Sequence, residues 1–111
     1  LERSLSFLEG SIGGVDPAAF YAALARALRV YLSVRVLPEA PMLTPRELAL
    51  LPEARFPAQG IRDEAASALA ETDEARFGPP GGQPSAASMR ASIARAAAIG
   101  KATEEALDAG L

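Results

Sequence analysis

The sequence predicts an all-α protein: a compact bundle of three to four helices with short connections marked by proline and a longer C-terminal helix. Two observations favour this fold class. Alanine and leucine dominate the apolar residues while only 5% of the chain is aromatic, a composition that suits closely packed helices. Runs of Val, Ile, Thr and aromatic residues, which build strands, are scarce. The length of 111 residues fits one domain with one modest core.

We expect the rest of the chain to pack on residues 16–36, DPAAFYAALARALRVYLSVRV. Asp16 fits an N-cap, and Pro17 fits the first helical position, where a missing N–H costs nothing. Along the predicted helix, one broad apolar face carries Phe20, Leu24, Ala27, Leu28, Tyr31 and Val34. Arginines interrupt the apolar run, so the pattern does not indicate a membrane span.

Residues 1–15 form a lead-in segment, for which the sequence allows either a short helix or an irregular stretch. Leu5 and Phe7 alternate as in a strand, whereas Leu1, Leu5 and Leu8 suit a helix. Glycines end the segment in either case. We expect Phe7 or Leu8 to dock on the core.

A capping box predicts a short helix in the middle of the chain. Thr44 fits the N-cap and Pro45 the first helical position. Glu47 follows the cap by three residues, so its carboxylate can accept a hydrogen bond from the Thr44 N–H. Pro52 stops this helix, and Leu48 should face inward. The cap accounts for Glu47 without any catalytic role.

A second long helix is predicted from Ile61 to Phe77, preceded by Phe56 as an apolar plug for the core. Acidic residues form its solvated side, and one face carries Ile61, Ala65, Ala68, Leu69, Thr72 and Ala75. Glycine and two prolines end the helix. Residues 16–78 are therefore the predicted helical core domain, and residues 79–86 a Gly/Pro linker.

Residues 87–111 are predicted to form the C-terminal helix, with Ser85 or Ser88 as its cap. One narrow face holds Met89, Ile93, Ala96, Gly100 and Leu107. Ala96 and Gly100 are small enough to let another helix approach closely. Two interpretations stay open: the face packs on the core, or it is an interaction face on which a second copy forms a homodimer.

The composition argues against catalysis, metal binding and nucleic-acid binding. The chain has no histidine and no cysteine, which removes the commonest general base and the thiolate nucleophile. Its adjacent acids, such as Asp63 and Glu64, point to different sides of a helix. The net charge is −3, and no basic stripe is present that could neutralise phosphates. We therefore expect no enzyme, no catalytic residue, no metal, no cofactor and no nucleic acid.

Three motifs, taken in order, resemble a small helical domain found after the last membrane span of some bacterial proteins. They are FYAALARALRVYL, LTPRELALL and ETDEARFG. This order is similar to the C-terminal cytoplasmic domain of BatD-like aerotolerance proteins and to the C-terminal helical domain of membrane-bound transglutaminase-like proteins (the DUF4129 type). The resemblance covers residues 17–78, and the matching residues are Thr44, Pro45, Glu47, Leu48, Arg76 and Phe77. Phe77 stands where tyrosine is common in those domains.

The resemblance implies a non-catalytic protein-interaction or accessory domain of a bacterial membrane-anchored protein. Its motif residues would be structural, and its partners would be other proteins, including components of a membrane complex. The domain would lie on the cytoplasmic side of the inner membrane, tethered by a span outside this chain and not itself inserted. The second hypothesis, a homo-oligomerisation module, rests on the face of the C-terminal helix.

Overall fold

The computed structural model describes residues 1–14, 16–77 and 85–110. These residues form α-helices and short 3₁₀ turns, and the described ranges contain no strand. The helices are α1 (Glu2–Ser11), α2 (Pro17–Arg35), α3 (Pro45–Ala49), α4 (Ile61–Phe77) and α5 (Ala86–Ala109). The 3₁₀ turns, η1 (Ala40–Met42) and η2 (Glu53–Arg55), flank α3. The predicted all-α fold is confirmed.

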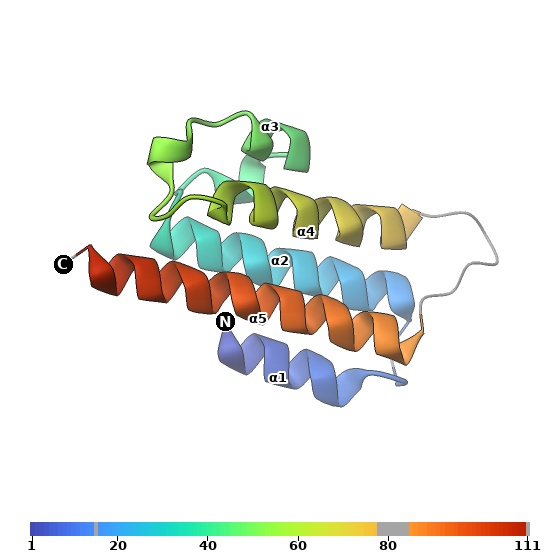
Figure 1. Cartoon of the computed structure of the whole chain (residues 1–111). Coiled ribbons are helices and arrows are strands. Elements are labelled where there is room, and N and C mark those ends of the chain that lie inside the picture. Colours follow the sequence, from blue (N-terminus) through green and yellow to red (C-terminus); the bar gives the residue numbers. More distant parts are fainter. Residues whose placement is uncertain (15, 78–84, 111) are drawn as a thin grey trace.

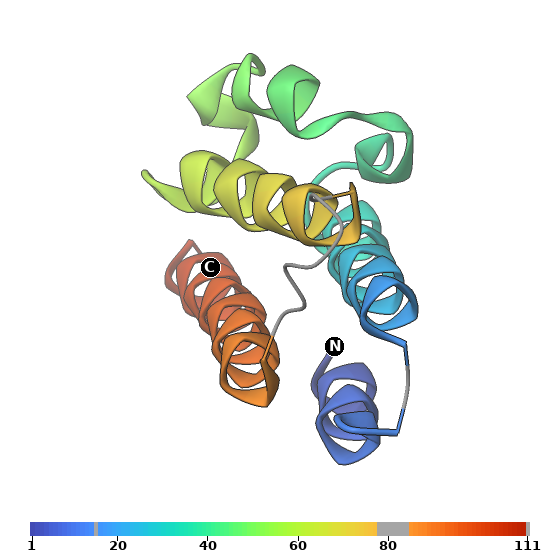
Figure 2. The same cartoon turned by 90° about the vertical axis from the view of Figure 1, so that its right-hand side faces the viewer.

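Four helices, α1, α2, α4 and α5, lie side by side as a bundle (Figure 1). Viewed along the bundle, the order around it is α1, α2, α4, α5, and each helix runs antiparallel to its neighbours (Figure 2). The short α3 packs on α4, and η1 packs on α2, so this connection lies on one side of the bundle. Helices that follow one another in the sequence are thus neighbours in space, as in up-and-down bundles.

The start of α2 is as the sequence predicts. The Asp16 carboxylate accepts a hydrogen bond from the Ala19 N–H at 3.2 Å, and Pro17 is the first helical residue. The inward side of the helix is almost fully buried and carries Phe20, Leu24, Leu28 and Leu32. This side anchors both parts of the core.

The prediction that Val34 belongs to the buried face is wrong. Its side chain is 75% exposed, and Ala27 and Tyr31 are only half-buried. Apolar residues occur on more than one side of α2, so the sequence offered several possible core-facing stripes. The buried stripe passes through Ala25 and Leu32 instead, because α4 and α5 pack on that side.

The core consists of two groups of buried side chains. One group joins α2, α3, α4 and α5, and includes Leu32, Leu37, Leu48, Phe56, Ile61, Leu69 and Ile99. The other joins α1, α2 and α5, and includes Leu5, Leu8, Phe20, Leu24, Met89 and Ile93. Phe56 is buried as the predicted plug. On α4 the predicted face is buried as expected, apart from the half-buried Ala75.

The lead-in segment is a helix over most of its length. Of the two predicted alternatives, the short helix is therefore correct. In α1, Leu5 and Leu8 are buried, whereas Phe7 is 77% exposed. Leu8 is therefore the residue that docks on the core. Gly13 allows the chain to leave α1, since its φ of +93° lies in the region that favours glycine.

The C-terminal helix begins one residue earlier than predicted, at Ala86. Ser85 is its N-cap and accepts a hydrogen bond from the Ser88 N–H at 3.1 Å. Most of the predicted linker, residues 79–84, lies outside the described residues. At the other boundary, α2 ends at Arg35, close to the predicted end at residue 36.

Candidate docking groove

The motif residues around α3 form the predicted capping box. Thr44 Oγ1 accepts from the Glu47 N–H at 3.1 Å, and Glu47 Oε1 accepts from the Thr44 N–H at 3.0 Å. The hydrogen bond from the Thr44 N–H, and secondly the interaction with the Thr44 side chain, hold the pKa of the Glu47 carboxyl below its usual value. Pro45 opens the helix, and Leu48 is buried against α4. All four residues therefore have structural roles.

The other two motif residues lie at the far end of α4. Arg76 belongs to its last turn and is half-buried. Phe77 is the last residue of the helix, and its side chain lies outside the described part of the structure. The motif residues thus occupy helix ends, one group at the start of α3 and the other at the end of α4.

The predicted interaction face of α5 packs within its own chain. Met89, Ile93, Ala96 and Gly100 are buried, and Leu107 is half-buried. A Cβ added at Gly100 would lie 2.8 Å from the Leu1 side chain, so a small residue at this position does permit a close approach. A homodimer through this face would require α5 to leave the bundle. The homodimer hypothesis stays a prediction.

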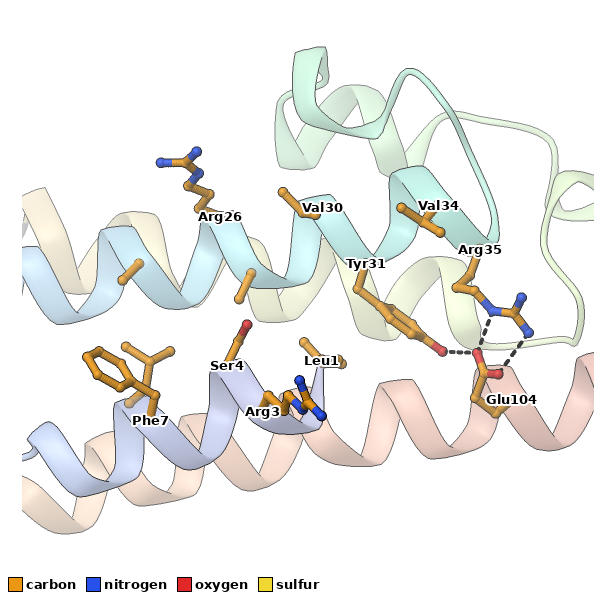
Figure 3. Close-up of a pocket in the computed structure, with 13 residues that line it drawn as sticks. Leu1, Arg3, Ser4, Phe7, Arg26, Val30, Tyr31, Val34, Arg35 and Glu104 are labelled. Carbon is orange, nitrogen blue, oxygen red and sulfur yellow. Dashed lines mark hydrogen bonds and ion pairs between the residues drawn. The ribbon is translucent and has the colours of Figure 1, made fainter.

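A groove of about 980 Å³ lies between α1 and α2 (Figure 3). We call it the α1–α2 groove. From α1 it is lined by Arg3, Ser4, Phe7 and Leu8, and from α2 by Ala23, Arg26, Ala27, Val30, Tyr31, Val34 and Arg35. Two further residues complete the lining: Leu1, which precedes α1, and Glu104, which lies on α5. The α2 residues recur at the three- and four-residue spacing of one helical stripe, so a single side of α2 forms one wall.

Among the described residues, α1 covers only part of the groove side of α2. Its 10 residues extend along only about half of the 19 residues of α2. Phe7 and Val34 are about three-quarters exposed, and Val30 is 48% exposed. These three are among the five large apolar side chains that are exposed in the described part of the chain. Exposed apolar side chains of this size therefore gather on one hollow of the surface.

Polar side chains close one end of the groove (Figure 3). Arg35 donates two hydrogen bonds to the Glu104 carboxylate, at 2.9 Å from Nε and 2.8 Å from Nη2. The Tyr31 hydroxyl contacts the same carboxylate and lies 3.1 Å from the Gly100 carbonyl oxygen. This cluster joins α2 to α5.

The same cluster is poorly suited to proton transfer. Hydrogen bonds from Arg35, and secondly from Tyr31, lower the pKa of Glu104, so its carboxyl holds no proton at neutral pH. Burial, and then the nearby Glu104, raise the pKa of the Tyr31 hydroxyl well above its usual value of about 10. A general acid or base works best with a pKa near the operating pH. The arrangement favours a structural tie over catalysis.

Two arginines stand on opposite sides of the groove, Arg3 on α1 and Arg26 on α2 (Figure 3). Both are exposed, and neither forms an ion pair with a carboxylate in the residues that the structure describes. The groove therefore combines an apolar floor with a basic rim. The groove was not predicted from the sequence. Its signal was Val30 and Val34, because α2 holds more apolar residues than one buried stripe requires.

Comparisons with protein-family models, with curated proteins and with solved structures found no match. In the described part of the chain, no helix has both the length and the apolar character needed to cross a bilayer. Nor do three His, Cys, Asp or Glu side chains gather there as metal ligands would.

Proposed function

We propose that this chain is a non-catalytic protein-interaction domain that holds an apolar segment of another protein in the α1–α2 groove. The observation that carries the proposal is the convergence of Phe7, Val30 and Val34 on one hollow. Covering apolar surface stabilises a complex by ~25 cal/mol per Å² before the costs of association are counted. A contiguous apolar surface in a concave site is typical of protein docking.

The walls of the groove are held in place before any partner binds. On α1, Leu5 and Leu8 are buried in the core beneath the exposed Phe7. On α2, Leu24 and Leu28 have the same anchoring role below the groove stripe. A site that is already formed loses little conformational entropy when a ligand binds, which favours affinity.

A display experiment tests this function. Genomic fragments of the source organism would be displayed and selected on the immobilised chain. We expect enriched in-frame fragments to bind the wild type and to lose at least about tenfold in affinity with Val34→Glu, which places a charge in the groove. Leu50→Glu is the matched control, because Leu50 is equally exposed, at 75%, and does not line the groove.

Equal binding of the selected fragments to wild type, Val34→Glu and Leu50→Glu would show that the groove is not the binding surface. The absence of any enriched fragment would contradict the function itself. Circular dichroism of each variant verifies that the fold persists, which we expect because both substitutions are on exposed positions.

We also propose that the domain is an accessory part of a bacterial membrane-anchored protein, on the cytoplasmic side of the inner membrane. What supports this is the order of the three motifs over residues 17–78. Protease protection on cells that produce the native protein tests the placement. The domain should sediment with membranes and become digestible only after the inner membrane is opened. Recovery in the soluble fraction would contradict the tether.

A further inference from the structure

We infer that the occupant of the α1–α2 groove is an amphipathic helix of another protein, with acidic residues on both sides of its apolar stripe. This inference rests on the proposed function, since it presumes that the groove binds a protein segment. It adds the conformation and the charge of that segment.

The groove suits a helix better than a strand. A strand binds by pairing its backbone with an exposed sheet edge, and both walls here are helices whose backbone groups are bonded internally. A helix instead inserts side-chain ridges into the furrow between two helices. The α2 wall runs from Ala23 to Arg35, a length of about 18 Å, or about three turns. A partner helix of similar length would place apolar residues at positions i, i+3, i+4 and i+7 against Phe7, Val30 and Val34.

The charge of the rim favours acidic flanks. Arg3 on α1 and Arg26 on α2 line the groove and pair with no carboxylate of the described residues. The third arginine of the lining, Arg35, is already held by Glu104. Elsewhere on the bundle, Arg62 and Arg95 pair with acids of their own chain, whereas the exposed Arg90 pairs with none of the described residues. The two rim arginines are therefore available for carboxylates on either flank of a bound helix.

Two other occupants are less favoured by the same observations. An anionic membrane would also attract arginines beside apolar residues, but a bilayer is a flat surface and the apolar residues here line a hollow of about 980 Å³. A second copy of this chain would have to supply an acidic helix with an exposed apolar stripe. The acidic α4 buries its own apolar face in the core. Both occupants are outcomes of the test.

The test uses a displayed library of designed helices about 14 residues long, enough for the three turns of the groove. The stripe positions are drawn from Leu, Ile, Phe and Met, and the flanking positions from Glu, Gln and Lys. Clones are selected on the wild type and counter-selected on Val34→Glu. We expect the selected clones to carry Glu more often than Lys at the flanking positions. Their affinity for the chain should fall when salt is raised from about 0.05 M to about 0.5 M.

The matched variant is the double substitution Arg3→Glu with Arg26→Glu, which reverses the rim and leaves the floor intact. Acidic clones should bind it about tenfold more weakly, and selection on it should enrich Lys. Groove-dependent clones without a charge bias would overturn this inference and leave the proposed function standing. A library from which no clone depends on Val34 would contradict both, whereas genomic fragments that bind in the groove without forming a helix would contradict only the inference.

Two further measurements exclude the other occupants. Cosedimentation of the chain with phosphatidylserine vesicles, if abolished by the double Arg→Glu variant, would assign the rim to a membrane and overturn the inference. Sedimentation velocity that shows a dimer disrupted by Val34→Glu would assign the groove to a second copy, with the same consequence. We expect neither vesicle binding nor a dimer.

Discussion

The two sides of α2 differ in how completely a neighbouring helix covers them. Towards α4, Leu28 and Leu32 are buried in the same group of side chains as Ala65 and Leu69. Towards α1, Val30 and Val34 of the same helix face open space in the α1–α2 groove. Residues of similar chemistry on one helix therefore have opposite environments.

Among the described residues, the two neighbouring helices cover different shares of α2. α4 has 17 residues and extends along nearly all of α2, whereas α1 has 10. At 1.5 Å per residue, α4 is about 10 Å longer. In the described residues, the apolar stripe of α2 continues past the part that α1 covers, and there it forms one wall of the α1–α2 groove.

The largest expected effect separates the two sides directly. Leu32→Ala should lower the free energy of unfolding by ~2–5 kcal/mol, because it leaves a cavity in a fully buried part of the core. Val34→Ala, two residues away, should change it by less than ~0.5 kcal/mol. Urea denaturation followed by circular dichroism measures both. Equal effects would show that the α1 side of α2 is as well packed as the α4 side.

The fold class and the helix starts could be predicted because they depend on local chemistry. Asp16 before Pro17, and Thr44 before Pro45, each satisfy backbone groups within one turn of the chain. The buried face of α4 was also predictable, since its acidic residues leave only one apolar side. In these places the local sequence admits one solution.

The register of α2 and the groove could not be predicted in the same way. Val34 is as apolar as Leu32, and only the packing of residues distant in the sequence decides which of the two is buried. Phe7 and Leu8 posed the same problem on α1, where the packing of α5 and α2 selects Leu8. The polar contact of Tyr31 with Glu104 joins residues 73 positions apart, and no local sequence pattern predicts it.

Tyr31→Phe should produce the next largest loss of stability. Tyr31 lies on the side of α2 that lines the groove. Loss of the hydroxyl removes its contacts with Glu104 and Gly100, and should lower stability by ~1 kcal/mol near pH 7. The raised pKa of Tyr31 means that the folded state keeps this proton more tightly than the unfolded state, so the contribution is present below pH ~10 and declines above it.

Thermal unfolding between pH ~8 and ~11 checks this prediction. The melting temperature of the wild type should fall more steeply above pH ~10 than that of Tyr31→Phe, and the two curves should converge. Parallel curves over the whole range would mean that the Tyr31 hydroxyl has no special stabilising contact in the fold.

Thr44→Ala tests the side of α4 on which α3 packs. We expect the free energy of unfolding to fall by ~1 kcal/mol, because the N-cap of α3 is lost. A helix of five residues cannot persist without its caps, so Leu48 should also become less firmly packed. Amide hydrogen exchange should show the loss of protection confined to residues 45–51. Thr44→Ser, which keeps the hydroxyl, is the matched control and should remain close to wild type. Loss of protection throughout α2 would instead indicate that α3 supports the whole bundle.

Arg95→Met should lower the free energy of unfolding by only about 0.5 kcal/mol, although Arg95 joins α5 to two acids of α4. Its Nη2 lies 3.3 Å from Glu64 Oε2, and its Nη1 pairs with Glu71; both acids are more than half exposed, so water screens the pairs. Arg90→Met is the control, because Arg90 is exposed on α5 and forms no ion pair with the described residues. Urea denaturation at low and high salt should show the Arg95 effect shrinking as salt rises. A loss as large as that of Leu32→Ala would mean that charge, and not apolar packing, holds α5 against α4.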